Sequence, residues 1–131
     1  MINAEKTPED ILKEELLKER AVVLGRTGES VQKALDKLRT AEAVIEKLRE
    51  HLSVLAGQDD LQTMPCGNPA WEKRQAVAEI NKQIDQYNRM REYAKLRYYY
   101  LIVTREALGL RRHGWVEKAY PIPPKKNYFL E

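Results

Sequence analysis

The residues of this sequence that could perform catalysis or bind a metal ion do not stand at the spacings that such chemistry requires. Cys66 is the single cysteine, and the two histidines, His51 and His113, lie too far apart in sequence to form a ligand pair. Glu50 precedes His51, but the second histidine of a helical zinc-protease motif is absent. The stretch GRTGES, residues 25–30, lacks the lysine of a phosphate-binding loop. We therefore expect no enzyme activity, no catalytic residue, no cofactor and no metal site.

The spacing of apolar residues predicts two long helices. Thr7 and Asn68 each precede a proline, which is typical of a helix start because proline at the first helical position loses no hydrogen bond. After both starts, apolar residues recur at intervals of seven, the pattern of a coiled-coil seam. The seam positions are Leu17, Leu24, Val31, Leu38, Ile45 and Leu52 in the first helix, and Ile80, Tyr87, Ala94, Leu101 and Leu108 in the second.

These helices predict one all-α domain over residues 1–131, built as a long antiparallel, coiled-coil-like hairpin. We expect a helix over about 8–56, a turn over 57–68 where Gly, Asp, Pro and Asn cluster, and a second helix over about 69–112. The chain then ends in an extended tail over 113–131, which contains three prolines within four residues.

Two glycines, Gly25 and Gly28, leave an alternative open within the first helix. Each costs about 1 kcal/mol relative to alanine in a helix, so the helix could break near residues 25–28 and give three helices in all. The heptad register continues through the glycines, which favours one helix. In the continuous hairpin the two glycines would lie opposite Leu101 and Tyr98, where small residues leave room for large ones.

Charge is distributed unequally along the chain. Residues 1–68 hold 10 basic and 13 acidic residues, whereas residues 69–131 hold 13 basic and 7 acidic residues. This asymmetry favours two segments that pair with each other, and Arg105, for example, would lie near Glu14 or Glu19. Positive charge also suits phosphate groups, so nucleic-acid binding is the alternative function. Its candidate contacts are Arg111, Arg112, Lys125 and Lys126.

The second helix carries a further apolar row on a face away from the seam. Its members follow one another at spacings of three and four residues: Tyr93, Leu96, Tyr100, Val103, Ala107 and Leu110. A helix that is apolar on two faces is expected to be buried on both, and the first helix can cover only one. The tail could cover the second face in a monomer, or a second chain could cover it in a four-helix bundle. The dimer is favoured, because a two-helix hairpin buries little surface on its own.

The sequence shows no membrane segment, because no apolar stretch approaches the ~20 residues that span a bilayer. The acidic first residues also lack the pattern of a signal peptide, so we expect a cytoplasmic protein without a membrane partner. Together these patterns indicate a non-enzymatic interaction or assembly protein of adaptor or chaperone-like kind. It would act as a homodimer and through contacts with a protein partner.

Overall fold

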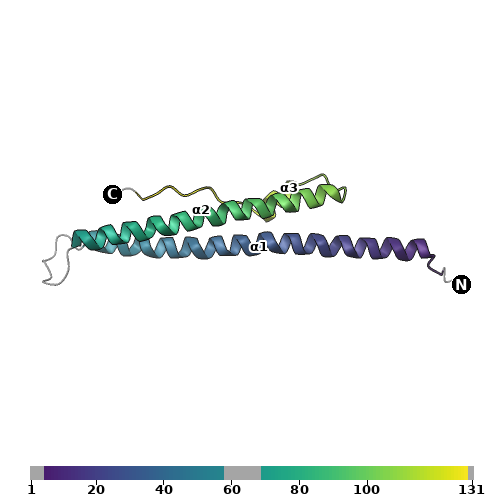
Figure 1. The fold of residues 1–131 in the computed structure, drawn as a ribbon, viewed down its shortest axis with the longest axis horizontal. Coiled ribbons are helices and arrows are strands. Elements are labelled where there is room, and N and C mark those ends of the chain that lie inside the picture. The colour runs from purple at the N-terminus through teal and green to yellow at the C-terminus, as the bar shows by residue number, and fades with distance from the viewer. Residues whose placement is uncertain (1–4, 58–68, 130–131) are drawn as a thin grey trace. The chain divides into compact units, whose positions relative to one another are not determined.

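The computed structural model describes residues 5–57 and 69–129, which form three helices and no strand (Figure 1). The helices are α1 (Pro8–Gly57), α2 (Pro69–Ala107) and α3 (Gly114–Ala119), and the two long helices pack against each other. The prediction of an all-α chain is therefore confirmed. Of the predicted turn, only residue 57 is described, and it belongs to α1. The rest of the turn, including Cys66, lies outside the described residues.

The chain divides into two compact units, and both long helices contribute a segment to each. The first unit comprises Met1–Lys33 and Leu96–Pro121, and the second comprises Ala34–Lys95 and Ile122–Glu131. In the second unit, Lys126 contacts Glu42 of α1 and Asn88 of α2, whereas Phe129 lies beside Leu52 of α1 and bonds to Asn81 of α2. Residue numbers thus rise along α1 where they fall along α2, so the two helical segments run in opposite directions there.

Helix α1 begins with a capping box and continues without a break through both glycines. The Asp10 amide donates a hydrogen bond to Thr7 Oγ1 at 3.2 Å, and the Thr7 amide donates one to the Asp10 carboxylate at 3.3 Å. These reciprocal bonds pair two amides at the helix start, and Pro8 at the first helical position has no amide to pair. The start at Pro8 and the continuity of α1 agree with the sequence prediction.

The predicted packing of the two glycines is wrong. A side chain at Gly25 would meet no other atom within 4 Å. Gly28 is buried, but the group that faces it is the hydroxyl of Tyr120, 2.9 Å from the position a Cβ atom would take. Tyr120 follows α3, so the pairing of the two long helices could not identify it.

In the second unit, the heptad positions form the core. Nine apolar side chains from both long helices are at most 8 % exposed in this unit: Ala34, Leu35, Leu38, Ile45, Leu52, Ile80, Ile84, Tyr87 and Ala94. Burying each large aliphatic or aromatic side chain stabilises the fold by about 1.5–3 kcal/mol. This seam is therefore the main attraction between the two helical segments of the unit.

The first unit has a smaller core, formed around Val31, Leu101 and Val116, which are at most 4 % exposed. Every residue of α1 from 8 to 23 is exposed, since no described segment of the chain packs on this part of the helix. The predicted seam is therefore wrong at Leu17, which is 62 % exposed, although the heptad positions from Val31 onward are buried.

Helix α2 ends at Ala107, before the predicted end at residue 112. The Leu110 amide donates to the Arg105 carbonyl at 2.9 Å and the Gly109 amide donates to the Glu106 carbonyl at 3.0 Å. These two bonds define a Schellman motif, which requires a residue with positive φ, and Gly109 has φ of 86°. The helix stops here because glycine adopts this backbone conformation without steric cost.

Buried Arg105 fixes the connection between α2 and α3. Its Nε–H donates to His113 Nδ1 at 3.3 Å, and its Nη2 donates to the backbone carbonyl of Arg112 at 2.9 Å. Its guanidinium lies 4.8 Å from the centre of the Trp115 ring. These contacts pair the charge within its own unit. The predicted ion pair of Arg105 with Glu14 or Glu19 is therefore wrong.

The prediction of a wholly extended tail over 113–131 is also wrong, because α3 occupies its first part. After α3 and a bend at Tyr120, residues 121–129 continue without helix or turn. The tail proper is therefore the segment from Pro121 to Phe129.

The backbone requirement at Gly109 gives a testable contrast with Gly25. Gly109→Ala should lower the free energy of unfolding by about 1–2 kcal/mol, because alanine at positive φ is strained. Gly25→Ala should raise it by about 0.5–1 kcal/mol, because the site is helical and has room for a methyl group. Urea denaturation of both variants measures the difference, and equal effects of the two substitutions would contradict the assigned helix end.

Candidate interaction surfaces

The apolar row of α2, here called the outer row, is exposed in the single chain. Its large members are 40–46 % exposed: Tyr93, Leu96, Tyr100, Val103 and Leu110. Ala107 is exposed as well, and Leu110 lies beyond the end of α2. The tail, one of the two segments predicted to bury this row, therefore does not cover it.

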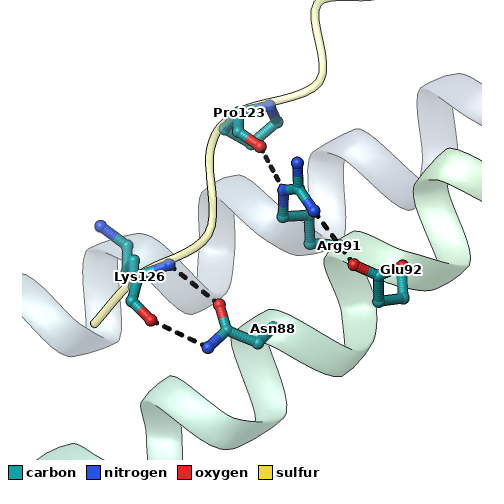
Figure 2. Close-up of polar contacts among 5 residues, drawn as sticks. All are labelled: Asn88, Arg91, Glu92, Pro123 and Lys126. Carbon is teal, nitrogen blue, oxygen red and sulfur yellow. Dashed lines mark hydrogen bonds and ion pairs between the residues drawn. The ribbon is translucent and has the colours of Figure 1, made fainter. Parts of the chain in front are cut away.

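The tail instead docks on the second unit, where two asparagines of α2, Asn81 and Asn88, hold its backbone. Figure 2 shows the contact of Asn88. The Asn88 side-chain amide donates to the Lys126 carbonyl at 2.9 Å and accepts from the Lys126 amide at 3.0 Å. Asn81 forms the same pair of bonds with Phe129, at 3.3 and 2.7 Å. Each asparagine therefore satisfies both polar groups of one tail residue, as a neighbouring strand would do.

Arg91 adds a backbone contact with a third tail residue, Pro123, which lies three residues before Lys126. The Nε–H of Arg91 donates to the Pro123 carbonyl at 2.6 Å, and Nη1 of the same side chain pairs with Glu92 at 3.0 Å (Figure 2). The Arg91 side chain is only 17 % exposed, so this charge-assisted bond is partly shielded from water.

Two side chains of the tail contribute contacts of their own. Lys126 Nζ lies 3.4 Å from a carboxylate oxygen of Glu42 on α1 and 5.0 Å from the centre of the Tyr87 ring on α2. The Tyr128 hydroxyl donates to the carboxylate of Asp85. The tail thus contacts both helical segments of the second unit.

The spacing of these contacts matches an extended chain. Pro123, Lys126 and Phe129, which all contact α2 through their backbone, are three residues apart. Three residues is the repeat of a polyproline-type chain, which advances about 3.1 Å per residue. Asn81 and Asn88 are seven residues apart, about 10.5 Å along a helix. Three residues of a polyproline-type chain span about 9.3 Å, so the two repeats differ by only about 1.2 Å.

The four cations predicted to contact nucleic acid differ in their surroundings. Arg111, Arg112 and Lys125 are exposed. Lys126 is not, because its amine is held by Glu42 and the Tyr87 ring and its side chain is 17 % exposed. Arg111 and Arg112 belong to the first unit, whereas the two lysines belong to the second.

The described residues offer few other features that point to chemistry. Within them, no three side chains of His, Cys, Asp or Glu come together in a way that could hold a metal ion. None of the described helices is both long and apolar enough to cross a membrane.

Comparisons of the chain with models of protein families, with curated protein sequences and with solved structures found no match. Two surfaces of the chain bear on its function: the exposed outer row, and the surface of the second unit that holds the tail, here called the groove.

The bond between Tyr128 and Asp85 makes tail docking sensitive to alkaline pH. This hydrogen bond and the Asp85 charge raise the pKa of Tyr128 above its usual value of 10.0. A raised pKa in the docked state means that the contribution is fully present below about pH 10 and is lost as the pH rises through the docked-state pKa. Asp85→Ala should therefore lower the pKa of Tyr128, measured by NMR titration of its ring.

The matched control for this titration is Glu79→Ala, since Glu79 lies on the same helix and bonds to Gln83. It should leave the Tyr128 titration unchanged. A Tyr128 pKa that is the same in Asp85→Ala and in the unmodified chain would contradict the docked position of the tail.

Proposed function

We propose that this chain is a non-enzymatic interaction or assembly protein that acts as a homodimer, with the outer row of α2 at the dimer interface. The observation that carries the proposal is that the outer row stays exposed although the tail is docked elsewhere. Single exposed apolar residues are ordinary on a protein surface, but a continuous row on one helix face is typical of a surface that binds another protein.

A second exposed apolar surface supports a second copy as the occupant. Residues 8–23 of α1 hold five acidic and three basic residues, and residues 93–112, which include the outer row, hold five basic residues and one acidic residue. The exposed apolar side chains of the α1 segment are Ile11, Leu12, Leu16, Leu17, Val22 and Val23. Each chain therefore carries two apolar surfaces with opposite net charge.

A twofold pair of chains would use both surfaces at once. The α1 segment of each copy would cover the outer row of the other, so that one contact is made twice. Opposite charges beside the apolar residues would select the antiparallel register and disfavour other pairings. The product would be a four-helix arrangement with the coiled-coil-like packing of helical bundles. Its outer helix surfaces would then be available to protein partners, as an adaptor or assembly protein requires.

Nucleic-acid binding is the less favoured function. A protein that binds nucleic acid through its charge commonly makes about 6–10 phosphate contacts. Of the four predicted cations, Lys126 is already engaged by Glu42 and Tyr87, which leaves Arg111, Arg112 and Lys125 exposed. The tail thus uses one of the four cations for its own docking.

A valine pair tests the dimer proposal. Val103 lies in the outer row and is 43 % exposed, whereas Val54 is an exposed valine of α1 outside it, 57 % exposed. Val103→Glu should weaken dimerisation at least ~100-fold, because it would bury an unpaired carboxylate in the interface. Val54→Glu should leave dimerisation unchanged.

Light scattering on a sizing column measures the outcome. The unmodified chain and Val54→Glu should have about twice the 15.3 kDa mass of one chain, and Val103→Glu should have the mass of one chain. Circular dichroism should show the same helix content in all three. A monomeric unmodified chain at ~100 µM, or a Val103→Glu chain that remains dimeric, would refute the proposal.

A further inference from the structure

We infer that the groove now filled by the tail is a recognition site for an extended peptide segment of a partner protein, and that the tail is its internal occupant. The groove lies entirely within the second unit, between the facing segments of α1 and α2. It is distinct from the outer row, and it needs no second copy of the chain to be complete.

The groove recognises a backbone conformation. Asn81 and Asn88 make four hydrogen bonds, and all four go to main-chain atoms of the tail. Arg91 adds a bond to a third main-chain carbonyl. Any segment of polyproline-type backbone offers the same atoms every third residue, so these contacts do not require the tail's own side chains. Asparagine is a poor helix former, and its presence at two positions one contact repeat apart on α2 is explained by this use.

Side-chain contacts define the chemistry of the ligand. The Glu42 carboxylate and the face of the Tyr87 ring form a site for a cation, now filled by the amine of Lys126. Three residues further, Phe129 lies beside an open cavity of about 480 Å³, lined by Arg49, Leu52 and Ser53. Three residues before the cation, Pro123 presents its carbonyl to Arg91. The preferred ligand is therefore an extended segment with lysine or arginine at one position and an aromatic residue three positions later.

A partner segment, rather than the tail of a second copy, is the occupant that could displace the tail. A second copy would make the same contacts as the tail already present, so exchange would bring no difference in binding free energy. A different segment can gain contacts, because Arg49 Nε is a buried nitrogen without a hydrogen-bond partner in the described residues.

The docked tail competes with such a partner for the groove, so it sets the affinity that a partner segment needs. A tethered segment competes at an effective concentration on the order of mM, so a free peptide of the same sequence binds the unmodified chain only weakly. Weakening the tail without changing the groove should reveal the site. Lys126→Pro does this, because proline keeps the extended backbone but removes both the amide that Asn88 accepts from and the amine held by Glu42.

The test uses the full-length chain and a fluorescently labelled peptide of the sequence PIPPKKNYF, residues 121–129. Fluorescence anisotropy should show that the peptide binds the Lys126→Pro chain at least ~10-fold more tightly than the unmodified chain. The matched control is Lys125→Pro, which alters the neighbouring exposed residue and should bind the peptide as weakly as the unmodified chain does.

Two further variants connect the binding to the groove. Adding Asn88→Ala to the Lys126→Pro chain should abolish the gain, and a peptide with proline in place of the lysine at position 126 should not bind. The inference would be overturned if the Lys126→Pro chain bound the peptide no more tightly than the unmodified chain. It would also be overturned if adding Asn88→Ala left the tighter peptide binding unchanged. Loss of the dimer in the Lys126→Pro chain would overturn it as well, because the tail would then bridge two copies. The dimer proposal fails independently, through Val103→Glu.

Discussion

Burial of the heptad side chains between α1 and α2 is the constraint on which the other contacts depend. In the second unit it commits one face of α2, around Ile84 and Tyr87, to the seam. The tail then occupies a neighbouring face, where Asn81 and Asn88 stand. The outer row lies on neither of these faces and remains exposed. One helix thus carries an apolar seam, a polar docking face and an exposed apolar row.

The sequence was sufficient to predict the features that repeat along the chain. The heptad positions from Val31 to Leu52 are buried, and Thr7 before Pro8 caps the start of α1, because both depend on local spacing. The end of α2 could have been predicted as well, since Gly109 is the glycine that a Schellman motif requires. Extending the helix to residue 112 gave too much weight to the apolar row and too little to this glycine.

The tail contacts could not be predicted in the same way. Asn81 and Asn88 bond to residues 48 and 38 positions away, and nothing in the local pattern connects them to the tail. Arg105 likewise pairs with His113 after a turn that the hairpin prediction did not contain. Such contacts depend on where the chain reverses direction. What the sequence did offer was two asparagines seven residues apart inside a helix, together with a proline-containing tail long enough to reach them.

The central claim is that the outer row is exposed in one chain and covered by a second. Hydroxyl-radical footprinting at ~1 and ~100 µM tests it most directly, with Tyr93 and Tyr100 as probes and Trp71, 58 % exposed and outside the row, as the internal control. The account predicts that the reactivity of both tyrosines falls several-fold at the higher concentration while that of Trp71 stays constant. Tyrosines that react equally at both concentrations, in a chain with the mass of a monomer, would contradict it.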